Sequence, residues 1–174
     1  MTPRAAQLRR RIRWFIWLFI FGLVFSGVTA IPTVMEVDAL VRTTGAQERV
    51  ASAPTPEAAP AWAVWLVNTQ TALHDTQDHH PVLFYGTDWL AFGHFVIAIV
   101  FIGVLRNPVR NRWLFDFGLL ACALVIPYAM IFGAVRGIPV WWRLIDCSFG
   151  VLGAIPLWLC RRWTKEMEAG GHHH

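Results

Sequence analysis

Titratable side chains interrupt the apolar segments of this sequence at positions where a lipid-embedded helix normally carries none. Asp88 lies at the start of the segment TDWLAFGHFVIAIVFIGVL, and His94 lies inside it. In a helix, six residues separate two side chains by about 9 Å along the axis and about 120° around it. Asp88 and His94 therefore meet only through neighbouring helices. Either side chain could act as the acid or base of a reaction.

Other apolar segments contribute polar side chains at a similar predicted depth. Arg143 and Asp146 are three residues apart and share a helical face, which continues with Gly150 and Gly153, small residues that let another helix approach closely. Ionisable residues within a membrane usually face a bundle interior or a wet cavity. We therefore predict one polar cavity with these ligand-binding candidates: Asp88, His94, Tyr128, Arg136, Arg143 and Asp146.

Two structural alternatives compete with this predicted site. Arg143 and Asp146 could simply neutralise each other and hold helices in register. His94 could be a histidine that is hydrogen-bonded in the core and has no role in chemistry.

A second polar cluster, HDTQDHH, precedes residue 88. A helix would place His74 and Asp78 on one face, with His79 and His80 following. Imidazole and carboxylate groups suit zinc or another divalent transition metal. The cluster lacks an H-E-x-x-H motif, and such runs are also common in solvated loops. A metal site at these four residues and a solvated loop are thus the two interpretations.

The composition indicates the environment in which these groups lie. Apolar residues make up 56% of the 174 residues, charged residues only 15%, and the mean hydropathy is +0.46. Soluble domains are about half apolar and a quarter charged. Four segments, 13–31, 88–105, 113–134 and 139–160, approach the roughly 20 residues that span a bilayer core. We predict an all-α membrane protein with a four-transmembrane-helix bundle.

Basic flanks predict the orientation of these spans. Arginines and one lysine concentrate in residues 1–12, 106–112 and 161–174, which we place in the cytoplasm, leaving 32–87 and 135–138 outside. This distribution favours a multi-pass protein of the bacterial inner membrane with both termini cytoplasmic, and it argues against nucleic acid as a partner. The terminal GGHHH is interpreted as an affinity-tag remnant.

The first span could be mistaken for a secretory signal, because basic residues precede it and Val28-x-Ala30 resembles a cleavage site. Its apolar run is longer than the 7–15 residues or so of a signal, and it is filled with Trp and Phe, so we interpret it as an uncleaved span.

Residues 32–87 are predicted to form an outer amphipathic helical cap. Apolar residues recur at helical spacing within 32–44, and 51–60 is an Ala/Pro linker. Pro60 then precedes a short helix with Trp62 and Trp65 on one face. This helix either lies on the membrane surface or packs as an ordinary loop helix.

The remaining polar residues receive ordinary structural interpretations. Asp38 is expected to be solvated, and Asp116 to pair with Arg110 or Arg112. The sequence has no C-x-x-C, G-x-S-x-G, P-loop or dinucleotide motif, so thiol redox chemistry and nucleotide-dependent catalysis have no support.

The loop RNPVRN at 106–111 and the stretch RGIPVWWRLIDCSFG at 136–150 resemble small bacterial four-span inner-membrane proteins. The resemblance covers most of the chain and implies the same topology, but it implies no activity.

The leading functional interpretation is a non-enzymatic membrane protein, either an accessory subunit of a larger membrane complex or a protein that binds a lipid or small ligand. The alternative is an integral-membrane enzyme that acts on a lipid-like substrate, with His94 or Asp88 as acid or base and Arg143 or Arg136 holding an anionic headgroup. A proton-coupled carrier is less favoured, because no inverted repeat is evident.

The predicted orientation is testable by thiol labelling in intact cells. A cysteine introduced at Ala53 should react with a membrane-impermeant reagent, and one at Asn107 should not, because only residues 32–87 are predicted to face outward. The unmodified chain with its native cysteines is the control. Labelling at Asn107 but not at Ala53 would reverse the topology.

Overall fold

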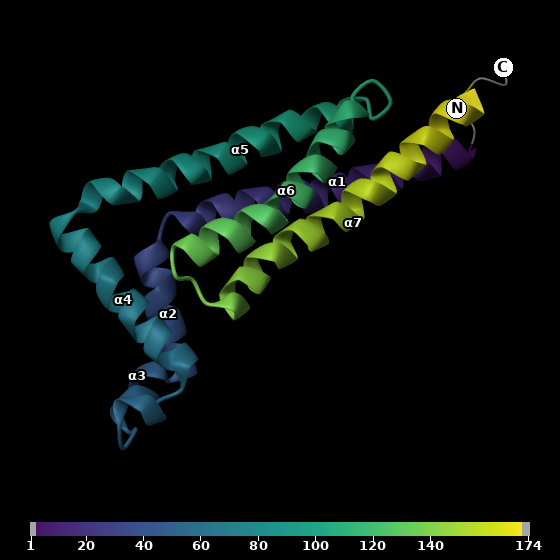
Figure 1. Ribbon diagram of the computed structural model, residues 1–174. Coiled ribbons are helices and arrows are strands. Elements are labelled where there is room, and N and C mark those ends of the chain that lie inside the picture. Colours follow the sequence, from purple (N-terminus) through teal and green to yellow (C-terminus); the bar gives the residue numbers. More distant parts are fainter. Residues whose placement is uncertain (1–2, 172–174) are drawn as a thin grey trace. The chain divides into compact units, whose positions relative to one another are not determined.

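The computed structural model describes residues 3–171, which fold into seven α-helices and two 3-10 turns, with no strand in this range (Figure 1). The all-α prediction is thus confirmed. The helices are α1 (Pro3–Ala30), α2 (Thr33–Thr44), α3 (Ala46–Ala51), α4 (Ala61–His79), α5 (Tyr85–Arg106), α6 (Trp113–Val135) and α7 (Val140–Gly171), and the turns are η1 (Pro56–Ala58) and η2 (Pro81–Phe84).

Four helical segments are long and apolar enough to cross a membrane: Pro3–Ala30, Pro81–Arg106, Trp113–Val135 and Val140–Gly170. They cover the four predicted spans except for residues 31 and 139, and three of them extend well beyond the prediction, the second by beginning at Pro81 and not at residue 88. The helix α1 begins ten residues before the predicted span, and α7 continues past residue 160 to Gly171. The extension of α1 is rich in Arg and Ala, and that of α7 in Arg, Lys and Glu, all of which are favourable helix formers. These charged extensions are therefore helical and not irregular tails.

The described residues form two units, each of which is taken by itself below. The bundle unit comprises residues 3–23 and 96–171, and the inter-span unit comprises residues 24–95.

The core of the bundle unit is a small set of fully buried side chains that face inward from four helical segments. Ile12 and Ile16 come from α1, Phe101 from α5, Phe115 from α6 and Leu157 from α7. Large apolar side chains also cover the outside: Trp17, Leu18, Phe21, Leu124 and Phe149 are all more than half exposed. Such a distribution is typical of helices whose outer surface contacts lipid.

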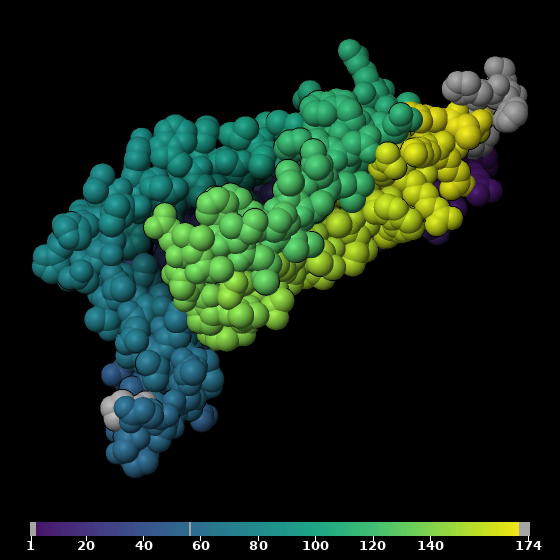
Figure 2. All heavy atoms as spheres, viewed as in Figure 1, coloured from purple at the N-terminus to yellow at the C-terminus, as the bar shows by residue number. Residues whose placement is uncertain are grey.

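The helices α6 and α7 form a tight hairpin (Figures 1 and 2). Gly137, in the left-handed conformation with φ 70°, donates its N–H to Ala134, and the N–H of Ile138 donates to Gly133 at 2.8 Å. These bonds end α6 in a Schellman motif. Further along the hairpin, a Cβ on Gly150 would lie 2.5 Å from the Cys122 carbonyl oxygen, so only glycine allows this approach.

One end of the bundle unit is held by charged contacts. This basic end comprises residues 3–13, 106–116 and 161–171. Arg4 Nε donates to Glu166 Oε1 at 2.7 Å, and Arg112 Nη1 to Glu168 Oε2 at 2.6 Å. Arg161 pairs with Asp116. The prediction that Asp116 pairs with Arg110 or Arg112 was wrong. The unexpected continuation of α7 brings Arg161 and Glu168 to these partners.

The inter-span unit contains its own small core. Val37 and Val41 of α2 and Ala63 and Leu66 of α4 are buried, and α4 packs against both α2 and α3. Gly45, with φ 64°, ends α2 and turns the chain into α3. These contacts favour the packed-helix interpretation of α4. The Ala/Pro linker contains one short 3-10 turn, η1.

Substitution of Gly150 tests the close contact between α6 and α7. We expect Gly150→Ala to destabilise the bundle by about 1–3 kcal/mol, because the added methyl group overlaps the backbone of Cys122. Gly22→Ala is the matched control: Gly22 has open space around its Cβ position and should gain up to about 1 kcal/mol of helix propensity. Thermal unfolding in detergent measures both. Equal stability of the two variants would contradict the packing account.

Candidate functional site

Arg143 lies in the first turn of α7, where its backbone N–H donates to the Pro139 carbonyl at 3.1 Å. Its side chain extends across the last turns of α6. A Cβ on Gly133 would lie 2.6 Å from Arg143 Cγ, so the absence of a side chain there makes room for the arginine. The guanidinium Nη1 donates to the Met130 carbonyl at 3.2 Å. Gly133 and the α6 backbone together therefore hold Arg143 in place.

The guanidinium group of Arg143 is incompletely compensated by protein. Its Nε atom is buried and has no hydrogen-bond partner among the described residues, a situation that it shares with Arg9 Nε. Within residues 3–171, no ion pair joins Arg143 to Asp146, although Asp146 is only three residues away and partly buried. The alternative in which the two charges neutralise each other was wrong. Helical spacing allowed the pair, but Gly133 lets Arg143 reach α6 instead.

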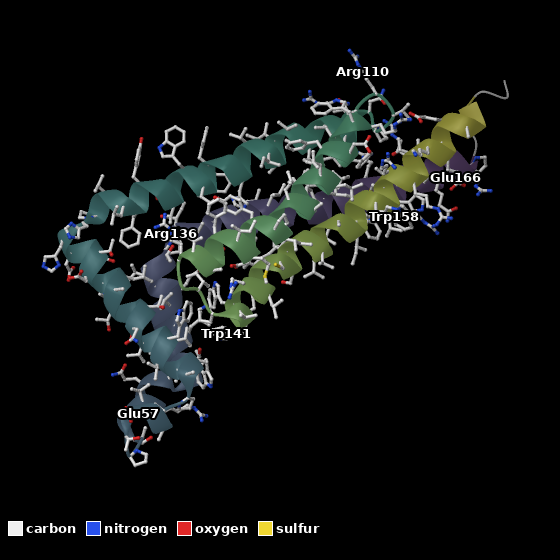
Figure 3. The ribbon with its side chains drawn as sticks, in the orientation of Figure 1. Glu57, Arg110, Arg136, Trp141, Trp158 and Glu166 are labelled. Atoms are coloured by element: carbon white, nitrogen blue, oxygen red, sulfur yellow. The ribbon has the colours of Figure 1, made fainter. Side chains whose placement is uncertain are left out.

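Tyr128 and Arg136 occupy different positions on α6. Tyr128 is 66% exposed, and its ring lies 4.5 Å from that of Phe132. Arg136 is the exposed C-terminal cap of α6, close to the turn that leads to Trp141 (Figure 3). A cation at this position is stabilised by the helix dipole. Among the described residues, neither side chain forms a hydrogen bond or ion pair with Arg143.

Asp88 and His94 belong to the inter-span unit, on the first half of α5. This half packs closely on α1, since a Cβ on Gly27 would lie 3.1 Å from the Ala91 carbonyl oxygen. Asp88 borders a shallow groove of about 230 Å³ whose other walls are the rings of Tyr85, Trp89 and Phe92. Tyr and Trp in such a row are typical of a membrane–water interface.

His94 is partly exposed and bonded within its own helix. Its Nδ1 lies 2.8 Å from the Leu90 carbonyl oxygen. Since a carbonyl only accepts, this contact assigns a hydrogen to Nδ1 and leaves Nε2 without a role in it. The other four candidates lie in the bundle unit, and their convergence with Asp88 and His94 in one cavity stays a prediction.

A three-residue polar cluster, which the sequence did not reveal, joins α2 to α4. Asp38 Oδ1 accepts a hydrogen bond from Gln70 Nε2 at 2.7 Å and lies 2.9 Å from His74 Nε2. The bonds from Gln70 and from His74 hold the pKa of the Asp38 carboxyl below its usual 3.8. Gln70 and His74 are four residues apart on α4, and this spacing was the available signal.

The HDTQDHH residues do not gather around one point. His74 contacts Asp38 and not Asp78, while His79 Nδ1 pairs with Asp75 at 3.0 Å. Across the described part of the chain, no group of three or more His, Cys, Asp or Glu side chains lies close enough to hold a metal ion. The cluster occupies the end of α4, where His74 and His79 pair with carboxylates and His80 follows the last helical residue.

No family model, curated protein or solved structure matches the chain. The resemblance to small bacterial four-span proteins stays a prediction.

The Asp38 cluster predicts a specific dependence of stability on pH. Because the pKa of Asp38 is lowered on folding, its contribution is present above pH 4 or so and is lost as the pH falls through the lowered value. Asp38→Asn should therefore reduce the loss of stability between about pH 5 and pH 3. Asp78→Asn on α4 is the control and should retain the wild-type profile. Thermal unfolding across this range would contradict the account if Asp38→Asn and wild type declined in parallel.

Proposed function

We propose that the chain is a non-enzymatic integral membrane protein that binds a phosphate-type anion through Arg143. The anion is either a lipid headgroup or a small phosphorylated ligand. The observation that supports this proposal most directly is the buried Nε atom of Arg143, which has no partner among the described residues.

A buried charge that is not fully compensated carries a free-energy cost. Burying an ionised group is expensive unless it is paired and hydrogen-bonded, and ionisable residues within membrane spans mark functional sites for this reason. One bond from Nη1 to the Met130 carbonyl compensates the guanidinium only in part. A bound anion would supply the remaining acceptors and the counter-charge. The planar donor fork of arginine matches phosphate oxygens, which accept two parallel hydrogen bonds.

The contacts that hold the Arg143 side chain support anion binding in preference to catalysis. Gly133 and the Met130 carbonyl fix the side chain, so little rotamer freedom remains to be lost when an anion binds. The enzyme alternative needs a base at His94 or Asp88. His94 donates from Nδ1 to its own helix, and Asp88 borders a groove of aromatic rings. Among the described residues, no hydroxyl or thiol group forms a hydrogen bond with either side chain, so the base–nucleophile pair that covalent chemistry would need is not assembled.

An accessory-subunit role is the second candidate, favoured by the charge of the segment between the first two spans. Residues 32–87 contain six acidic side chains against two arginines, and α2–α4 have their own packed core. A folded acidic surface of this kind suits a basic partner protein. We place this segment outside the bacterial inner membrane and both termini in the cytoplasm, on the basis of the basic flanks.

Removing Arg143 tests the proposed site. Arg143→Leu should weaken binding about 10-fold to 100-fold, the effect of losing a hydrogen bond to a charged group. Arg136→Leu is the matched control: it removes the same charge from an exposed position, and binding should stay within about twofold. The affinity for phosphatidylglycerol in mixed micelles and for inorganic phosphate distinguishes the two sources of the anion.

Stability separates this site from a structural charge pair. Breaking a buried ion pair costs about 3–5 kcal/mol, but Arg143 forms no such pair, so Arg143→Leu should unfold at close to the wild-type temperature. Wild-type affinity of a stable Arg143→Leu protein for both anions would reject the proposal.

A further inference from the structure

A groove separates the first turns of α1 from the last turns of α7 at the basic end of the bundle unit. Its volume is about 510 Å³, and the residues that line it are Pro3, Arg4, Gln7, Leu8, Arg11, Trp163 and Glu166. The two helices contact each other here. Arg4 binds Glu166, and the rings of Phe15 and Trp163 meet edge to face with centroids 5.3 Å apart. The groove therefore lies between helices whose side chains pack against each other.

The surroundings of the groove are strongly cationic. The basic end holds five arginines in residues 3–13, three in 106–112, and three basic side chains in 161–171, against three acids. Each acid, Asp116, Glu166 or Glu168, already binds an arginine. Even with these acids neutralised, eight formal positive charges are left over. A cluster of this size next to membrane spans attracts anionic lipids.

The groove also has apolar walls, which select the kind of anion. Leu8 is buried, and Trp163 presents its ring, over which the Arg11 guanidinium lies at 5.9 Å from the centroid. Figure 3 shows Glu166 and Trp158 along the same helix, where Arg162 lies over Trp158 at 5.9 Å. Cations stacked on tryptophan at the end of a span are typical of the headgroup layer. Cations beside apolar walls fit an amphiphile better than a free phosphate.

The depth of the groove agrees with this choice. The apolar part of α1 begins at Trp14, and a helix rises about 1.5 Å per residue, which puts Arg11 about 4–5 Å and Gln7 about 10 Å beyond it. The headgroup layer is roughly 5–8 Å thick on each side of the bilayer core. Arg11 thus lies within the layer, and Gln7 lies a few ångströms beyond its outer edge.

From these observations we propose that the α1–α7 groove is a binding site for the headgroup of an anionic phospholipid. The phosphate lies between Arg4 and Arg11, and the glycerol and upper acyl chain lie against Leu8 and Trp163. This site uses residues of the basic end only and is independent of Arg143.

The test adds one negative charge to the groove without removing any existing contact. Gln7→Glu places a carboxylate between Arg4 and Arg11 and should lower the affinity for phosphatidylglycerol about fivefold, the effect of one charge at a membrane surface. Ala6→Glu is the matched control, since it makes the same charge change at the neighbouring exposed position, which does not line the groove. Binding is measured on the full chain in neutral detergent, with phosphatidylcholine as the uncharged comparison lipid.

Both variants are made in the wild-type chain and in Arg143→Leu, so that loss of binding at Arg143 is distinguished from loss of binding at the groove. A loss with Gln7→Glu in both backgrounds, with little change for Ala6→Glu, is the expected result. Equal losses for the two variants would overturn the proposal in favour of diffuse attraction, and no loss for either would also overturn it. Arg11→Gln and Arg13→Gln provide a second pair of variants. A loss of affinity for Arg11→Gln with little change for Arg13→Gln is expected, and equal losses or no loss for either would overturn the proposal.

Discussion

A positive charge among membrane helices requires compensation, because the hydrocarbon core of a bilayer supplies neither water nor counter-ions. Arg143 is where this requirement shapes the structure. Gly133 leaves space for its hydrocarbon chain, and the Met130 carbonyl accepts one of its hydrogen bonds, yet within residues 3–171 the buried Nε atom has no partner. The short turn at Gly137 brings the end of α6 next to the start of α7 and makes this arrangement possible.

The rest of the bundle unit reflects a second consequence of the lipid environment. Helices in a membrane gain little from burying apolar side chains away from lipid, so close backbone packing carries more of the stability. Gly150 against the Cys122 carbonyl is such a contact. At the basic end, ion pairs join α7 to α1, to α6 and to the 106–112 loop. Glycine contacts within the spans and arginine ion pairs beyond them thus both stabilise the packing of the helices.

The sequence predicted the architecture well for a simple physical reason. Apolar length is a local property, and it indicated the four long apolar helices that the structure contains. The role of Gly150 also followed from its spacing on one helical face. The helical extensions of α1 and α7 were missed because hydropathy registers only the part of a helix that lies in lipid.

Side-chain partners were predicted less well, since they depend on which helices meet. Helical spacing allowed Arg143 to pair with Asp146 and His74 with Asp78, but each found a partner on another helix. Asp38 was expected to be solvated, because nothing in the sequence of α2 indicates that Gln70 and His74 lie opposite it. Asp116 was given a nearby arginine, whereas its partner Arg161 is 45 residues away. Tertiary packing determines these partners, and the spacing of residues along one helix does not show which helices pack together.

The central claim is that a phosphate-type anion compensates Arg143. The most direct measurement is the nitrogen–phosphorus dipolar coupling by solid-state NMR, on protein with ¹⁵N-labelled arginine in phospholipid bilayers, compared with the same sample of Arg143→Leu. Contact between a phosphate oxygen and Nε brings nitrogen and phosphorus within about 4 Å. The account predicts a strongly coupled Nε signal that is present in wild type and missing from the variant. Identical coupling in both samples would show that Arg143 contacts no phosphate and would contradict the account.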